Sequence, residues 1–248
     1  MTPARPDPAW QPFLRIGGIA AAVFVVMVLV PIVLLATAPI PPDEGPALLE
    51  YIADHKAVYL VQLGCFVGLA VPAMVVFAAV AVALSGVART AAALGGLLGV
   101  ASEVVALAVG SSPQSLHGGL VVLSDAYAGA STDAERAGLV AAADALIAAT
   151  NAMPWAGILT AGAILVLSWG MWRSGFGRVL AVVGVTTGAL GLVSEALRPV
   201  MGTGYLLYGL LLPVWFAWVG VGLLRSAAVR ERSTATGPDR QRTGGRHE

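Results

Sequence analysis

Two glutamates and one arginine stand where apolar sequence makes a charge costly. Glu103 lies inside a long apolar run, and Glu195 and Arg198 lie at the end of another. A charge within the hydrocarbon of a membrane costs about 2.5–3.5 kcal/mol on insertion scales, so it is expected to be paired, protonated or in contact with water. Such residues are suited to holding a proton or a cation.

Two interpretations of Glu103 are open. It follows the start of its apolar run by about 13 residues, or about 20 Å of helix, which places it in the outer half of a bilayer. In the first interpretation the carboxylate is a proton or cation site. In the second it is a structural carboxylate that bonds to neighbouring helices and fixes their packing.

Glu195 and Arg198 are three residues apart, so they share one face of a helix and can pair. Their place near the end of an apolar run favours a solvated pair at the membrane interface. A stronger hypothesis joins all three residues. Glu103, Glu195 and Arg198 would then form one polar cluster that faces outward.

Each of the two glutamates is the last residue of a sequence motif that occurs twice in the chain. Gly96–Glu103 and Gly188–Glu195 share a Gly-x-x-Gly spacing followed by Ser-Glu, and a Ser-Gly turn that ends in arginine precedes each, at 85–89 and 174–178. The motif would put both acids at equivalent places on two helices. If it is a duplication rather than a chance likeness of Gly- and Ala-rich helices, it is a parallel repeat.

Other chemistry has little support in the sequence. No histidine lies within an expected span, which excludes a bis-histidine haem between helices, and the phosphate-loop, HExxH and nucleophile-elbow motifs are absent. Cys65 is the single cysteine, which excludes an intrachain disulfide and a cysteine-based metal cluster. The formal net charge of zero suggests no nucleic-acid partner. We therefore expect no catalytic residue, cofactor or metal.

The composition predicts a membrane protein. Of 248 residues 58% are hydrophobic and 11% are charged, against about 25% charged in soluble domains. Apolar runs of about 20 residues cross a hydrocarbon core about 30 Å thick, and only helices satisfy their own backbone there. We therefore expect an all-α polytopic bundle, the membrane domain being residues 14–225. Its expected spans are 16–36, 58–84, 90–109, 153–171, 179–197 and 205–224.

The connection of about 40 residues between the third and fourth spans is too long for a structureless loop. Thr132 and Glu135 have the spacing of a capping box, which predicts a helix from about Asp133. We therefore expect an extracytoplasmic helical segment here, with Pro154 marking a break before the fourth span. In the shorter loop before the second span, Pro46 is expected to begin a helical turn that lies along the membrane surface.

Arginines set the expected orientation. They gather at the N-terminus, at the two Ser-Gly turns and in the tail, and cytoplasmic segments carry such an excess. Both termini are therefore expected in the cytoplasm, with residues 1–13 as an N-terminal segment and 226–248 as a disordered tail. The first span is expected to be an uncleaved anchor, because its apolar run exceeds that of a signal peptide.

Three segments of the chain are similar to a family of uncharacterised bacterial integral membrane proteins. They are Gly45–His55, Leu139–Leu146 and Arg178–Gly184. The resemblance covers about residues 15–225 and implies a six-helix protein of the bacterial plasma membrane. It supplies no activity and no catalytic residues.

Three functions are open. The first is a non-enzymatic scaffold or regulatory membrane protein, whose partners are the bilayer and a second membrane protein or copy of this chain. The alternative is a small-solute, ion or proton transporter or channel that uses Glu103, and the third is an intramembrane lipid-modifying enzyme. A scaffold predicts a dry Gly- and Ala-lined contact around Glu103, a solute pathway predicts a water-filled cavity, and an enzyme predicts an open lateral cleft.

Overall fold

The computed structural model describes residues 8–34, 41–110, 116–152, 155–172, 174–198 and 205–235, and the fold is all-α. Its elements are η1 (Pro8–Trp10), α1 (Gln11–Leu34), α2 (Gly45–Phe66), α3 (Ala70–Leu84), α4 (Arg89–Val109), α5 (Gly118–Gly129), α6 (Asp133–Ala152), α7 (Trp155–Met171), α8 (Arg178–Ala196) and α10 (Tyr205–Ala235). Six helical stretches of the described residues are long and apolar enough to cross a membrane. The predicted fold class is confirmed.

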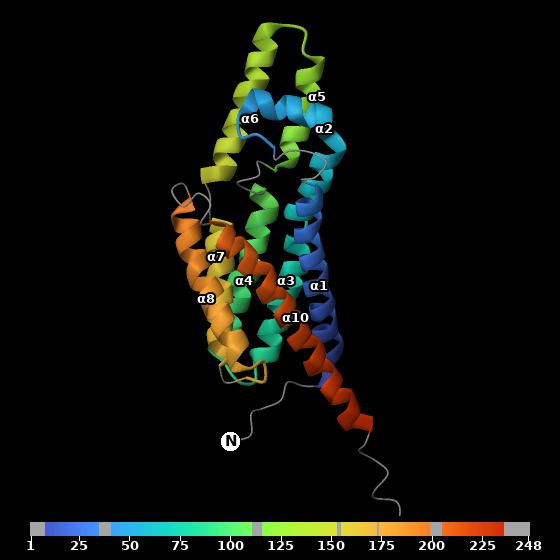
Figure 1. Ribbon diagram of the computed structural model, residues 1–248, viewed down its shortest axis with the longest axis vertical. Helices are drawn as coiled ribbons and strands as arrows, with labels where there is room; N and C mark the ends of the chain where they lie inside the picture. The colour runs from blue at the N-terminus through green and yellow to red at the C-terminus, as the bar shows by residue number, and fades with distance from the viewer. Residues whose placement is uncertain are drawn as a thin grey trace, which may run out of the picture.

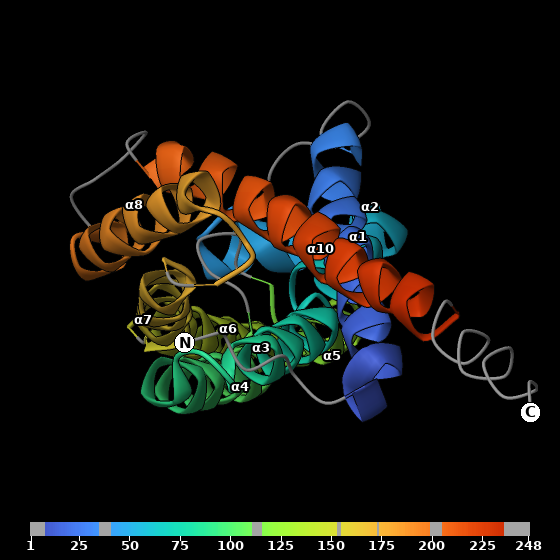
Figure 2. The same ribbon diagram turned by 90° about the horizontal axis from the view of Figure 1, so that it is seen from below.

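The helices form two parts, which Figure 1 shows one above the other. We call α1, α3, α4, α7, α8 and α10 the bundle, and α5, α6 and the first half of α2 the cap. The start of α1 and the end of α10 lie at the bundle end opposite the cap, as an even number of spans requires. Seen from below in Figure 2, α10 crosses α1 obliquely, and α4 lies beside α7.

The second expected span, 58–84, is two helices in the structure. α2 ends at Phe66, three residues form a turn, and α3 begins at Ala70. Pro72 is the third residue of α3. Its missing N–H costs little there, since the first four N–H groups of a helix have no partner within the helix.

The cap has a hydrophobic core of its own. The side chains of Leu48, Leu49 and Ile52 are fully buried, although we expected this turn to lie along the membrane surface. They pack against residues of the cap helices and the segment before α5, namely Leu116, Leu120, Ala143 and Ile147. The apolar face at the start of α2 is therefore covered by helices and not by lipid, because either can cover such a face.

The first half of α2 is fixed to the cap by polar contacts. Pro46 stands in the first turn of α2, as predicted, and the Gly45 N–H donates to Asp144 Oδ1 of α6 at 2.8 Å. The Ser124 hydroxyl of α5 donates to the Leu49 carbonyl at 2.7 Å. The backbone of α2 then leaves helical geometry at His55 (φ −124°, ψ 31°), where the helix turns from the cap toward the bundle.

The predicted capping box starts α6. The Glu135 N–H donates to Thr132 Oγ1 at 3.2 Å, and α6 begins at Asp133 as expected. The returning bond differs by one residue, because Glu135 Oε2 accepts from the Ser131 N–H at 3.1 Å. The expected break at Pro154 lies outside the described residues.

α10 is longer than its expected span. It runs to Ala235, past residue 224, so the first part of the segment expected to be disordered is helical. Ala and Arg predominate just after the span, and both are strong helix formers that let the helix continue out of an apolar run. The rest of the tail, 236–248, and residues 1–7 lie outside the described residues.

The bundle core is aromatic at its centre. Trp215 is fully buried. Its indole N–H donates to Ser168 Oγ at 3.0 Å, which satisfies the one polar group of the ring. Trp155 and Trp169, near the two ends of α7, are 58% and 69% exposed, as belt residues would be.

Candidate functional site

Glycines of the repeat bring the two helices of each hairpin, α3–α4 and α7–α8, close together. In α4 a Cβ added at Gly99 would lie 2.7 Å from Phe77 Cβ of α3. In α8 a Cβ added at Gly188 would lie 2.6 Å from the backbone N of Leu165 in α7. Each second helix therefore approaches the first one closely, as small residues allow in membranes.

Both glutamates of the repeat reach the same stretch of α7. Glu103 Oε1 of α4 lies 3.3 Å from Thr160 Oγ1, and the Glu195 carboxylate of α8 packs on Gly157, where an added Cβ would collide with it. Gly157 and Thr160 are three residues apart, so they are one helical turn apart. The two acids approach this turn from the two helices that pack against α7.

Glu195 is held by two partners. Arg198 Nη2 contacts Glu195 Oε2, and the Tyr205 hydroxyl donates to Glu195 Oε1 at 2.7 Å. The guanidinium also lies 5.5 Å from the centre of the Tyr205 ring. Glu195 is only 2% exposed, so the expectation of a solvated pair is wrong. The start of α10 covers the pair, which a reading of α8 alone does not reveal.

Glu103 lacks such partners. It is 4% exposed, and the hydroxyls of Ser102 and Thr160 lie 3.2 and 3.3 Å from its Oε1. Each hydroxyl is nearer to a carbonyl of its own helix, Ser102 to Gly99 O at 2.6 Å and Thr160 to Ala156 O at 3.0 Å. A hydroxyl has one proton. The contact of each hydroxyl with Glu103 therefore competes with the shorter bond to its own helix, and no charged partner of Glu103 is found in the described part of the chain.

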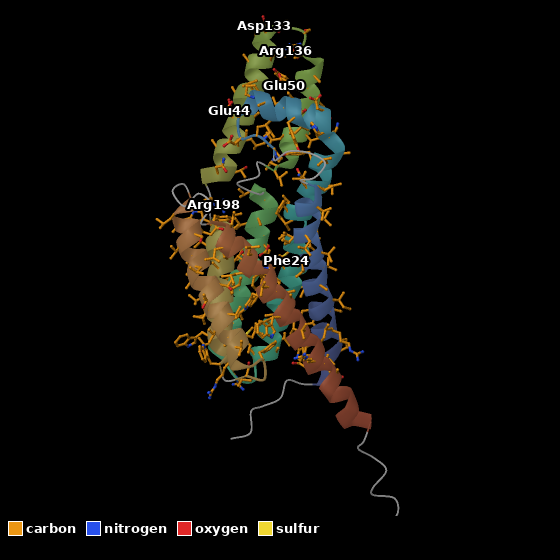
Figure 3. All side chains as sticks on the ribbon, viewed as in Figure 1. Phe24, Glu44, Glu50, Asp133, Arg136 and Arg198 are labelled. Carbon is orange, nitrogen blue, oxygen red and sulfur yellow. The ribbon has the colours of Figure 1, made fainter. Side chains whose placement is uncertain are left out.

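A cavity of about 250 Å³ lies where the bundle meets the cap, and Glu103, Glu195 and Arg198 all line it. Its other polar wall residues include Thr150 of α6, whose hydroxyl donates to Leu146 O at 2.9 Å. Five aromatic residues complete the wall: Phe24, Phe66, Tyr205, Tyr208 and Phe216. Figure 3 places Arg198 at the cap end of the bundle and Phe24 deeper, beside α10.

The cavity is large enough for a small molecule. One water needs about 15 Å³ of such space, so the cavity has room for several waters or one compact solute, and it is smaller than the pockets of about 300–1,000 Å³ that hold drug-sized ligands. Among the described residues, no three His, Cys, Asp or Glu side chains come together in a way that holds a metal ion. The arrangement is suited to a solute that meets one unpaired carboxylate and several rings.

Comparison of the chain with protein-family models, with curated proteins and with solved structures finds no match. No family is therefore identified. The six apolar helical stretches are those of a multi-pass membrane protein, which is in contact with a lipid bilayer.

The sequence did not point to Thr160, Tyr205 or Tyr208 as site residues. Thr160 is a single hydroxyl in an apolar run, and such a residue most often bonds back to its own helix, as this one also does. Tyr205 and Tyr208 are three residues apart and so share a face of α10. That spacing was a usable signal, although tyrosines at a span end are also typical of the membrane interface.

Proposed function

We propose that this chain is an integral membrane protein that binds a small solute in the cavity between bundle and cap, as part of a transport function. One observation carries the proposal. Carboxylates from two helices, α4 and α8, line a single cavity. An ionisable residue that faces a cavity inside a membrane is by default a functional site.

This cavity favours the transport alternative over a scaffold. A scaffold needs tight contacts of small residues, and the chain has them at Gly99 and Gly188. The helices nevertheless leave about 250 Å³ open around the charged groups. Polar groups that line an open space can hold a polar solute, because they can hydrogen-bond it there.

The same geometry supports binding over catalysis. Acid–base chemistry on a lipid needs titratable groups that are free to exchange protons with the substrate. Glu195 is engaged by Arg198 and Tyr205. Glu103 remains as the one wall carboxylate without such partners, which suits recognition of a charge.

The proposed orientation follows from the arginines at helix starts. Arg15, Arg89 and Arg178 stand near the starts of α1, α4 and α8, which lie at the bundle end opposite the cap. The positive-inside rule places that end in the cytoplasm together with both termini. The cavity then opens toward the extracytoplasmic side of a plasma membrane. From the resemblance to bacterial membrane proteins, we propose that this membrane is a bacterial one.

Engineered cysteines test whether water and solutes reach the cavity. In a chain carrying Cys65→Ala, we expect an impermeant, charged thiol reagent to label Ala106→Cys and Ala156→Cys, which line the cavity. Thiols react as thiolates, which need water. Val104→Cys is the matched control, because Val104 is 54% exposed on the outside of α4 at the depth of Glu103 and would face lipid. Equal, negligible labelling at all three positions would favour a dry scaffold instead.

A further inference from the structure

We propose that the cavity binds a small organic cation, an ammonium group on a compact apolar body, and that Glu103 supplies its counter-charge. The inference rests on the proposed solute-binding function and names the class of solute. It follows from three observations: the charges in the wall, the aromatic rings, and the absence of a metal-binding group of side chains in the described chain.

The charges of the wall select a cation. Two carboxylates and one guanidinium line the cavity, and the guanidinium of Arg198 is already paired with Glu195. An anionic solute would have to break that buried pair and would be repelled by Glu103. A cation instead gives Glu103 a charged partner, whereas in the described chain its polar contacts are the neutral hydroxyls of Ser102 and Thr160. Without such a partner, a buried carboxylate has to be protonated or reached by water.

The rings of the wall select an organic body. Phe66 and Tyr205 line the cavity and are half-buried, so part of each ring is accessible. Phe24, Phe216 and Tyr208 lie in the same wall and are buried, with the Phe24 and Phe216 rings stacked at 3.8 Å between centres. An ammonium group within about 6 Å of a ring centre is attracted by the ring face, and methyl groups on the nitrogen fill apolar space.

A bare metal ion fits less well. Calcium and magnesium take about six or more oxygen ligands at short distances. Within the described residues no group of three acidic, histidine or cysteine side chains is placed to hold one. The cavity volume of about 250 Å³ also matches a small molecule better than an ion.

The ammonium chemistry has two possible sources, a free solute or a lipid headgroup. The test therefore uses the full chain in nanodiscs of phosphatidylglycerol, which carry no ammonium headgroup. Calorimetric titration compares choline with its neutral isostere, in which carbon replaces the nitrogen, and with the anion tert-butylacetate. A second set of discs contains phosphatidylcholine. If the lipid headgroup occupies the cavity, free choline should bind more weakly in the discs that contain phosphatidylcholine. If the natural ligand is a free solute, the affinity for choline should be the same in both sets of discs.

We expect choline to bind and the neutral and anionic isosteres not to bind. Glu103→Gln should weaken choline binding by about tenfold or more, because a lost charged contact is worth at least about 1.4 kcal/mol, or one factor of ten. Glu50→Gln is the matched control, since Glu50 is exposed on the cap (Figure 3) and outside the cavity, and should change affinity less than about twofold.

If the neutral isostere binds as well as choline, or if tert-butylacetate binds better, the proposal that the solute is a cation is overturned. The proposed solute site itself would still stand. Choline binding that survives Glu103→Gln would overturn the role of Glu103. If no probe binds, the inference fails, and the cysteine labelling at Ala106 and Ala156 still decides independently whether the cavity is a solute site.

Discussion

Arg198→Ala is expected to lower the free energy of unfolding by about 3–5 kcal/mol, because it leaves a buried carboxylate without its counter-charge. Glu195, the partner of Arg198, is 2% exposed and keeps only the Tyr205 hydroxyl as a strong contact. Reversible unfolding in mixed detergent micelles measures the change. The loss should exceed that of any other single charge removal in the described chain.

The matched control for that variant is the other ion pair of the described chain. Lys56 Nζ lies 2.6 Å from Asp125 Oδ1, and the two side chains are 45% and 59% exposed. Lys56→Ala should cost at most about 1 kcal/mol, since exposed pairs contribute little. If Arg198→Ala is no more costly than Lys56→Ala, Glu195 is either hydrated or uncharged, and the account of the pair fails.

Trp215→Ala is expected to destabilise the bundle by about 3–5 kcal/mol, the range for removing a buried large aromatic side chain. The indole is fully buried between Phe77 and Phe216, with ring centres 6.1 and 5.2 Å away, and its N–H donates to Ser168 Oγ. Removing it leaves a void and an unpaired hydroxyl. The same unfolding measurement applies.

Trp169→Ala controls for the loss of an indole as such. Trp169 is 69% exposed near the end of α7, so its replacement should change stability by about 0.5 kcal/mol or less. Similar losses for the two variants would contradict the placement of Trp215 in the core. Trp215 is also adjacent to Phe216, which lines the cavity, so Trp215→Ala should weaken solute binding as well.

The spans could be predicted because the bilayer imposes them. A run of about 20 apolar residues must be helical in lipid whatever its neighbours do. The break before α3 was not predictable in the same way. Pro72 was visible, but a proline fits equally a kink or the first turn of a new helix, and the turn at 67–69 decides between them.

The cap shows a second limit of the sequence. The apolar face with Leu48 and Ile52 was visible, and so was the helix start at Asp133. A face of this kind can lie on lipid or on other helices. Long-range contacts with Leu120 of α5 and Ile147 of α6 show that this face packs on other helices. No local sequence pattern encodes these contacts.

The candidate site was predictable in part. The Glu195–Arg198 contact follows from a spacing of three residues on a helix, and Glu103 was apparent as a charge in an apolar run. The burial of the pair depends on Tyr205 of α10, and the approach of both acids to one turn depends on α7. These contacts join separate helices, so the spacing within each helix carries no information about them.

The central claim is that Glu103 and Arg198, on different helices, act as one polar cluster around one cavity. A double-mutant cycle with Glu103→Gln and Arg198→Ala, read as free energies of unfolding, tests it most directly. Without Glu103 there is one acid fewer for Arg198 to balance, so the double variant should lose less stability than the sum of the single variants, by about 0.5 kcal/mol or more. Additive losses would contradict the claim.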